Sequence, residues 1–326
     1  MLFISQQKNL PFFLIAIGFL ASYISSMFSS ELAFVIYLLG GLKYVGVFMF
    51  IIGSRKLKFI PLILVYGSII VSSLKGAMFH DLLTWLIFLG IIAAIKYRPS
   101  THIKFILSCG FILFVIIIQI LKKDYRVATW EKGQATGLAT FSSAYEENQR
   151  EGGFLMANVL EKQIVRINQG YIVTNIMKTV PNVVPFSNGE ELKQILTAAI
   201  LPRFMAPDKL KAGDHGIFEK YTGLGLRKGT SMGLSSIGDA YINFGVFGGC
   251  IFMFVLGLLY SEVLKAFHRY SKYYPVLLLF TPLVFYYPIR PDCELQTILG
   301  HLVKSCFLIY VVFLVWRRYF RVVDSS

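Results

Sequence analysis

Three arginines that stand beside apolar runs carry the clearest chemical potential in this sequence. Arg126 follows an apolar run, Arg203 lies in the stretch LPRFMAPDK, and Arg290 lies in the stretch IRPDCE. A guanidinium group is always charged, and its planar fork of donors matches the oxygens of a phosphate. Lys209 adds a fourth cation to the LPRFMAPDK stretch. Cations of this kind at one membrane face could clamp a pyrophosphate group.

Acidic groups and one histidine accompany these cations. Asp239 opens a later apolar run, Asp292 and Glu294 follow Arg290, and His215 stands next to Asp214. A carboxylate or an imidazole can take the proton from an attacking hydroxyl group. A pyrophosphate clamp next to such a base is what a transfer from a lipid-pyrophosphate donor needs.

Each of these residues also has a structural interpretation. Arg126 can be an interfacial anchor, Arg203 can cap the carbonyl groups of a preceding helix, and Arg290 can pair with a nearby carboxylate. Asp239 can be a helix-start carboxylate that interacts with the positive end of the helix dipole. His215 can be a solvated loop histidine. His301 and Lys304 lie inside the last apolar run, where each can pair or snorkel. Lys43 lies deep in the second run, where a simple anchor is unusual.

Long apolar runs must position these groups. The chain has 326 residues, of which 56% are hydrophobic and only 15% are charged, against about 25% charged in soluble domains. A helix needs about 20 apolar residues to cross a bilayer. The sequence has eight candidate runs: 10–28, 32–52, 59–74, 82–96, 104–121, 241–260, 274–289 and 299–316. We therefore expect an all-α, polytopic membrane protein, whose first run is retained rather than cleaved as a signal peptide.

Basic residues predict the orientation. The net charge is +14, which in a soluble protein would suggest nucleic acid, yet much of the excess lies in short clusters between apolar runs. Three Lys or Arg residues follow each of the second, fourth, sixth and eighth runs, whereas the opposite short loops hold only Lys75 and Arg290. The positive-inside rule then puts both termini in the cytoplasm.

The predicted domains are transmembrane helices 1–5 at residues 1–121, a large extracytoplasmic loop at 122–237 and transmembrane helices 6–8 at 238–326. Apolar residues recur with helical spacing over 154–172, which predicts an amphipathic helix. Ser187 and Glu190 form a capping-box pattern before a second helix, which Pro202 should end. We expect the glycines of GVFGG at 245–249 to be helix-packing positions.

The four cysteines show no metal-site or disulfide spacing, and no zinc, Walker, Rossmann or nucleophile-elbow pattern is present. The sequence therefore predicts no metal and no cofactor.

Four stretches of the sequence resemble a known family. KKDYR, LPRFMAPDK, SSIGDAYINFGVFGG and RPDCELQTILGHLVKS together span 122–305 and are similar to motifs of bacterial Wzy-type oligosaccharide repeat-unit polymerases, of the O-antigen, capsule and exopolysaccharide kind. The resemblance implies a GT-C-like glycosyltransferase in the bacterial inner membrane. Such enzymes move a growing glycan from undecaprenyl pyrophosphate to an incoming lipid-linked repeat unit, and they commonly have ten or more spans.

The resemblance also implies roles for individual residues. Arg126, Arg203, Lys209 and Arg290 would hold the donor pyrophosphate, and Asp239, or else His215, would act on the acceptor hydroxyl. The residues expected to bind substrate are Tyr241, Asn243, Asp292 and Glu294. The expected partners are the lipid-linked oligosaccharide, membrane lipids, a flippase and a chain-length regulator, with no nucleic acid.

Three alternatives stay open at this point. An O-antigen ligase would share the architecture and the donor. A lipid-linked oligosaccharide flippase or exporter should show repeated halves, broken helices and several intramembrane charges. A scaffold in a polysaccharide assembly complex would not need the arginines.

Overall fold

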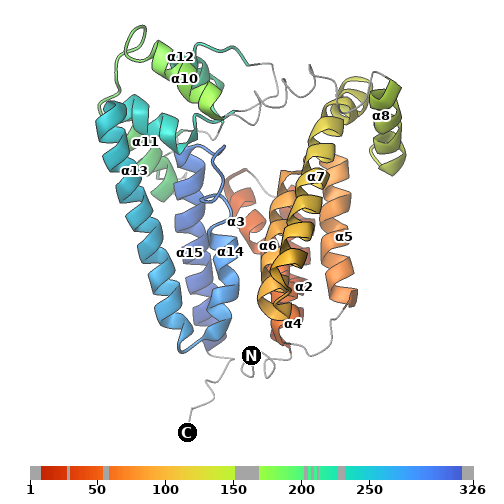
Figure 1. Cartoon of the computed structure of the whole chain (residues 1–326). Coiled ribbons are helices and arrows are strands. Elements are labelled where there is room, and N and C mark those ends of the chain that lie inside the picture. Colours follow the sequence, from red (N-terminus) through yellow and green to blue (C-terminus); the bar gives the residue numbers. More distant parts are fainter. Residues whose placement is uncertain are drawn as a thin grey trace. The chain divides into compact units, whose positions relative to one another are not determined.

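A computed structural model describes residues 9–27, 30–53, 59–150, 169–201, 205–206, 209–210, 213–226 and 232–317. Over these ranges every regular element is a helix (Figure 1). The all-α prediction is thereby confirmed. The chain divides into two compact units, one formed by Met1–Ile17 and Leu42–Ile167 and the other by Gly18–Gly41 and Asn168–Ser326. We describe each unit by itself.

The described residues form 6 helices that are long and apolar enough to cross a membrane. They are Phe34–Gly53, Phe59–Gly76, His80–Tyr97, Thr101–Glu131, Ser235–Ser271 and Leu295–Val315. The first and seventh predicted runs form the shorter apolar helices Leu10–Ile24 and Pro275–Val284. Many of the apolar side chains are exposed, as lipid-facing side chains are, and Phe247 is the clearest at 81%. The chain thus has several helices that fit a membrane protein.

The first unit packs around α4 (Leu42–Gly53), in which every residue from Leu42 to Ile52 is buried. Its neighbours are α5 (Phe59–Gly76) and α6 (His80–Tyr97), and α7 (Thr101–Arg126) follows. The Tyr44 ring stacks on Trp85 at 3.9 Å, and the Tyr66 hydroxyl donates to the Trp85 carbonyl at 3.0 Å. A short π-helical turn (Val127–Glu131) and α8 (Leu138–Arg150) complete the described part, and α2 (Leu10–Ile24) begins in this unit.

The second unit is built on two long helices, α13 (Ser235–Ser271) and α15 (Leu295–Arg317). Between them in sequence come a short 3-10 helix (Pro275–Phe280) and α14 (Thr281–Val284), and α3 (Ser30–Gly40) contacts α15. Three further helices lie toward the amino-terminal ends of α13 and α15 (Figure 1): α10 (Gln169–Thr179), α11 (Glu190–Ile200) and α12 (His215–Thr222). The apolar faces of α10 and α12 share a core with α13 that includes Ile176, Phe218 and Ile242. The apolar face of α11 packs in a second core that includes Ile195, Leu256 of α13 and Leu299 of α15.

The predicted helix after the capping-box pattern is α11, and it begins later than that pattern implies. Its N-cap is Gly189 at φ 93° and its first residue is Glu190. The Ser187 hydroxyl nevertheless accepts a hydrogen bond from the Glu191 amide at 2.8 Å. Ser187 thus does cap the helix, from outside the expected position. The helix predicted over 154–172 lies outside the described residues up to 168, and Pro202 lies outside them as well.

A break at Gly245 divides α13 into two segments. The backbone of Gly245 has φ 66° and ψ −164°, a conformation that only glycine adopts without strain. The break leaves the Ile242 carbonyl available to another donor, and the Ser187 amide donates to it at 2.8 Å. Gly245 is therefore required for backbone conformation, rather than for the helix packing expected of this glycine stretch. The preceding segment, Ser235 to Phe244, carries the residues that build the candidate site.

Candidate functional site

The segment of α13 before Gly245 supplies side-chain caps to two other helices. Asp239 Oδ2 accepts a hydrogen bond from the amide of Leu295, the first residue of α15, at 2.7 Å. Asn243 Oδ1 accepts from the amide of Leu192 near the start of α11, at 3.1 Å. The first amides of a helix have no partner inside the helix, so a polar side chain from elsewhere can satisfy them. Asp239 also places its carboxyl group at the positive end of the α15 dipole.

Asp239 lines a small pocket together with three other carboxylates, Glu191, Asp214 and Glu294. The four come from separate places in the second unit: α13, α11, the residue before α12 and the residue before α15. The other lining residues are Ile195, Leu210, Ile217, Phe218, Met232, Leu234, Ile242 and Gln296. The fold thus collects acidic groups on largely apolar walls, where a carboxylate interacts strongly with any donor that enters.

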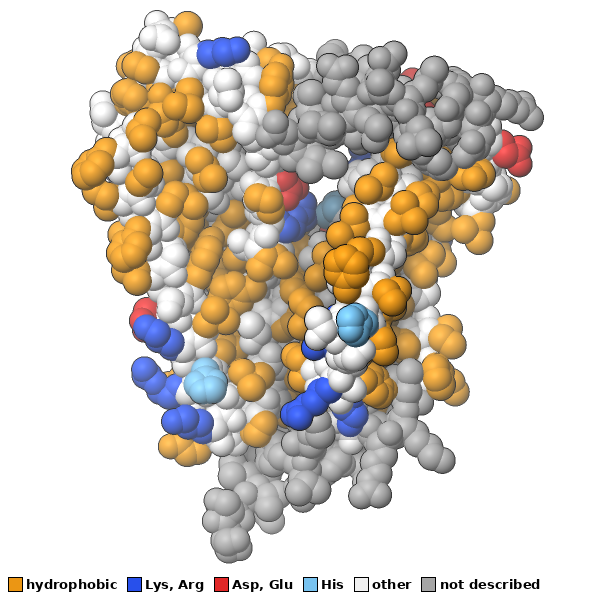
Figure 2. All heavy atoms as spheres, viewed as in Figure 1, with side chains coloured by type: hydrophobic (Ala, Val, Ile, Leu, Met, Phe, Trp, Pro, Cys, Tyr) orange, Lys and Arg blue, Asp and Glu red, His pale blue; other side chains and the backbone are white. Residues whose placement is uncertain are grey.

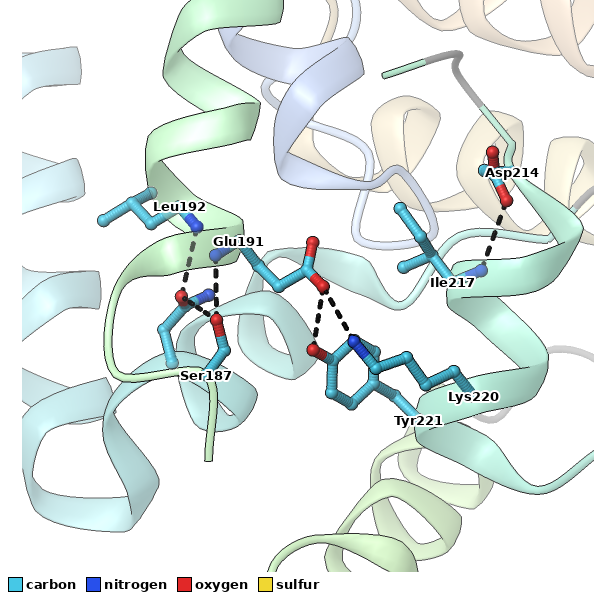
Figure 3. A network of polar contacts seen from close by, with 8 residues as sticks. Ser187, Glu191, Leu192, Asp214, Ile217, Lys220 and Tyr221 are labelled. Carbon is cyan, nitrogen blue, oxygen red and sulfur yellow. Dashed lines mark hydrogen bonds and ion pairs between the residues drawn. The ribbon is translucent and has the colours of Figure 1, made fainter. Parts of the chain in front are cut away.

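Glu191 anchors α12 to α11 at this pocket. Its Oε1 accepts from the Tyr221 hydroxyl at 2.8 Å and from Lys220 Nζ at 3.2 Å (Figure 3). Burial raises the pKa of Tyr221, so its hydroxyl stays a hydrogen-bond donor. The Lys220 ammonium lies over the Tyr221 ring at 4.5 Å. The negative charge of Glu191 is therefore partly offset by Lys220, and Tyr221 fixes the position of the carboxylate.

Glu294 is a half-buried candidate for proton transfer that lies outside the long apolar helices. Its Oε1 accepts from the Gly213 amide at 2.9 Å and from the Thr297 hydroxyl at 2.9 Å. Burial raises the pKa of Glu294, and these two hydrogen bonds only partly oppose that effect. The carboxyl group consequently holds its proton at a higher pH than an exposed glutamate does.

Asp214 and His215 begin α12, and the structure gives them different surroundings. Asp214 is the N-cap, and its Oδ1 accepts from the Gly216 amide at 2.8 Å and from the Ile217 amide at 3.2 Å (Figure 3). His215 is the first residue of the helix and is half-buried, but it is not among the residues that line the pocket. The pocket therefore brings together Asp239 and Glu294 from the predicted set, without His215.

Arg290 lies in the loop that leads to Glu294. Its Nη2 donates to Asp292 Oδ2 at 2.8 Å and its Nε donates to Asp292 Oδ1 at 3.3 Å. The guanidinium lies over the Tyr287 ring at 5.3 Å. Burial alone would lower the pKa of Arg290, but the hydrogen bonds and charge of Asp292 raise that pKa above its usual value. The pairing of Arg290 with a nearby carboxylate is thus observed, with Asp292 as the partner.

The other predicted cations have separate environments. In the first unit, Arg126 Nε donates to the Ala77 carbonyl at 2.9 Å and the guanidinium lies 4.6 Å from the Trp130 ring. Lys209 Nζ donates to the Leu201 carbonyl at 2.7 Å, at the end of α11. The helix cap considered for Arg203 is thus provided by Lys209, and Arg203 itself lies outside the described residues.

Two predicted substrate-binding residues are held by protein groups. The Tyr241 hydroxyl donates to the Val180 carbonyl at 3.1 Å. Asn243 uses Oδ1 for Leu192 and the Ser187 hydroxyl, and its Nδ2 donates to the Asp239 carbonyl at 2.8 Å. These contacts make both residues part of the frame around the pocket.

Comparison with known proteins places the chain in a family. The family described as Domain of unknown function (DUF8712) matches residues 2–319. The chain belongs to this family. No curated protein and no solved structure matches the chain. The DUF8712 match covers both units, so the α13 segment and the carboxylate pocket lie within the part of the chain that defines the family.

Of the pocket carboxylates, Glu191 was not predicted from the sequence, and Asp214 was considered only as the neighbour of His215. A signal existed for Glu191, because the buried residues of α11 are Glu191, Ile195, Ala198 and Ala199, which recur at helical spacing. A glutamate that continues an apolar stripe is a candidate for a buried, paired position. Asp214 could have been found as an N-cap before the short helix that starts at His215.

Among the residues that the structure describes, no group of His, Cys, Asp and Glu could hold a metal ion. The carboxylate oxygens of Asp214 and Glu294 accept hydrogen bonds from backbone amides. A carboxylate oxygen of Glu191 accepts hydrogen bonds from Lys220 and Tyr221. The arrangement suits donors such as hydroxyl groups, which a carboxylate can bind and deprotonate.

Proposed function

We propose that this member of the DUF8712 family is a membrane glycosyltransferase that polymerises lipid-linked oligosaccharide repeat units. It would transfer the growing glycan from undecaprenyl pyrophosphate to an incoming lipid-linked repeat unit. The lipid-linked oligosaccharide and membrane lipids would be its partners, together with a flippase and a chain-length regulator. The resemblance of four sequence stretches to Wzy-type polymerases is the basis for the donor and the acceptor.

The position of Asp239 carries this proposal. It belongs to the stretch that most resembles the polymerases, and it lines a pocket with Glu294 and Glu191. Arg290, which would stabilise the leaving pyrophosphate, lies four residues before Glu294. A base and an anion-binding arginine are the two groups that the transfer needs. Asp239 on α13 would be the base, and Arg290 in the loop before α15 would bind the anion.

In the proposed reaction, the acceptor hydroxyl oxygen attacks the anomeric carbon of the donor sugar. The bond between that carbon and the pyrophosphate oxygen breaks, and the lipid pyrophosphate leaves with both bonding electrons. The hydroxyl proton goes to the carboxylate of Asp239. In-line attack opposite the leaving group inverts the anomeric configuration. Arg290 would offset the negative charge that develops on the pyrophosphate, as would Arg203 and Lys209 of the same unit.

The proposed orientation has eight spans, cytoplasmic termini and an extracytoplasmic loop in a bacterial inner membrane. Within the second unit, the pocket lies at the amino-terminal end of α13, and Lys265, Arg269 and Lys272 lie at the other end. Figure 2 shows basic side chains at that end and hydrophobic ones along the helix. At 1.5 Å per residue, Val246 and Arg269 are about 35 Å apart, which is enough to cross about 30 Å of hydrocarbon. The positive-inside rule therefore favours a pocket outside the cytoplasm.

A flippase or exporter is the second candidate, and the break at Gly245 favours it, since broken helices line the substrate sites of many transporters. The break lies only ten residues from the start of a 37-residue helix, close to the pocket, whereas transporter breaks lie near the membrane midplane. The position of the break therefore supports a site at the membrane surface.

Reconstitution distinguishes the two candidates. The purified protein is placed in liposomes with an undecaprenyl-pyrophosphate repeat unit, without nucleotide sugars and without added metal, and the glycans are separated on a gel. A ladder with a spacing of one repeat unit is the expected result. Movement of the lipid-linked sugar between leaflets without a ladder would establish the transporter. The absence of both a ladder and leaflet movement would refute both proposals for this substrate.

A further inference from the structure

The Arg290 fork is already occupied by a carboxylate in the second unit. Two nitrogens of one guanidinium edge, Nε and Nη2, face the two carboxylate oxygens of Asp292. This is the bidentate geometry that a guanidinium also adopts with two oxygens of a phosphate. Asp292 thus stands where an oxygen pair of an anionic ligand would bind.

The two partners differ in how firmly they are held. The Arg290 side chain is only 16% exposed and its guanidinium lies over the Tyr287 ring, whereas the Asp292 side chain is 49% exposed. Because Asp292 is half-exposed, water can solvate its carboxylate when that group leaves the fork. The buried arginine stays oriented by the ring beneath it. Exchange at this fork would replace the aspartate and keep the arginine in place.

The backbone of this loop is fixed by close packing. A Cβ atom built on Gly233 would lie 2.9 Å from the Glu294 nitrogen and 3.4 Å from the Asp292 carbonyl oxygen. Glu294 in turn accepts hydrogen bonds from Gly213 and Thr297. The loop backbone next to the fork is therefore held in place by neighbouring groups of the second unit.

We propose that Asp292 is an intramolecular placeholder that occupies the Arg290 fork until the pyrophosphate group of the donor displaces it. This inference rests on the proposed function and adds a regulatory element to the same site. A pyrophosphate group carries more negative charge than a carboxylate and offers more acceptor oxygens, so it competes well for the fork. The placeholder keeps a buried arginine paired when no donor is bound, which avoids an uncompensated charge.

The placeholder lowers the apparent affinity for the anion, because only the fraction of molecules with an open fork can bind it. Replacing Asp292 by asparagine keeps the shape and removes the competing charge. We expect Asp292→Asn to bind inorganic pyrophosphate about fivefold more tightly than the wild type, because a larger fraction of the molecules then has an open fork.

The test is isothermal titration of inorganic pyrophosphate into the full chain in lipid nanodiscs. Arg290→Ala should lose most of the binding, Arg290→Lys should retain part of it, and Asp292→Asn in the Arg290→Ala background should gain nothing. Glu262→Gln is the matched control, since it removes a carboxylate from another exposed ion pair, with Lys265. This control should leave the affinity unchanged.

Weaker binding by Asp292→Asn would overturn the proposal and make Asp292 a group that positions Arg290. An equal gain in Glu262→Gln would also overturn it, because the effect would then come from net charge alone. The titration needs no glycan transfer, so a placeholder without a polymer ladder would refute the proposed function and leave this inference standing. A polymer ladder without tighter pyrophosphate binding by Asp292→Asn would support the proposed function and refute the placeholder.

Discussion

Asp239 Oδ2 accepts a hydrogen bond from the Leu295 amide at 2.7 Å, so a carboxylate on α13 caps the start of α15, 56 residues further along the chain. The same carboxylate lines the pocket with Glu191, Asp214 and Glu294. Asp239 therefore has a structural contact and a candidate catalytic position at once. Variants must separate these two roles.

The structural role of Asp239 predicts unequal effects of two substitutions. Asp239→Ala leaves the Leu295 amide without its acceptor and should destabilise the protein by about 1–2 kcal/mol, the usual loss for an N-cap. Asp239→Asn keeps an acceptor oxygen and should cost less. Thermal unfolding of the two variants in detergent measures the difference. Equal losses would mean that the cap contributes nothing.

Asn243 is predicted to act in the frame and not on the substrate. Its side chain is 2% exposed and satisfies the Leu192 amide. Asn243→Ala should destabilise the protein by about 1–3 kcal/mol, because a buried donor loses its partner. Asn182→Ala is the control, since Asn182 is exposed and bonds only the carbonyl of Lys178 within its own turn. Normal stability of Asn243→Ala with lost activity would contradict this account.

Gly245 and Gly257 lie on the same helix and should respond in opposite directions to alanine. Gly245 has φ 66°, and a side chain there should cost about 1–3 kcal/mol of strain. A Cβ atom on Gly257 meets nothing within 4 Å, so alanine there should be neutral or stabilise the helix by up to about 1 kcal/mol. Denaturant unfolding of both variants tests the break in α13. A stable Gly245→Ala protein would show that α13 can run straight.

Glu294 should make stability depend on pH. Burial raises its folded-state pKa above the unfolded value, so its contribution is fully present below the unfolded pKa and is lost as the pH rises through the folded pKa. Glu294→Gln keeps an oxygen for Gly213 and Thr297 but does not ionise. The stability of the variant minus that of the wild type should therefore grow as the pH is raised from about 4 to 7. A constant or shrinking difference would contradict the assignment.

Composition and hydropathy predicted the helical class, and each of the eight apolar runs coincides with a helical segment. These features depend on local sequence, which is why they could be predicted. The helix lengths were less predictable, because among the described residues the first and seventh runs form the shorter apolar helices Leu10–Ile24 and Pro275–Val284.

The site was less predictable, because its contacts join residues far apart in sequence. The spacing of residues cannot show that Asp239 meets Leu295, or that Asn243 meets Leu192. Lys209 caps the end of α11, and the cap expected from Arg203 stays a prediction, because Arg203 lies outside the described residues. The Arg290 pairing was foreseeable, because Asp292 is only two residues away.

The most direct test of the account compares the wild type with Asp239→Asn in liposomes that contain the lipid-linked repeat unit. Asparagine can cap Leu295 but cannot take a proton, so the variant should fold and bind pyrophosphate yet form polymer about 10²–10⁴-fold more slowly. A ladder is expected for the wild type and almost none for Asp239→Asn. A folded Asp239→Asn protein that makes the wild-type ladder at the wild-type rate would show that Asp239 is only a helix cap.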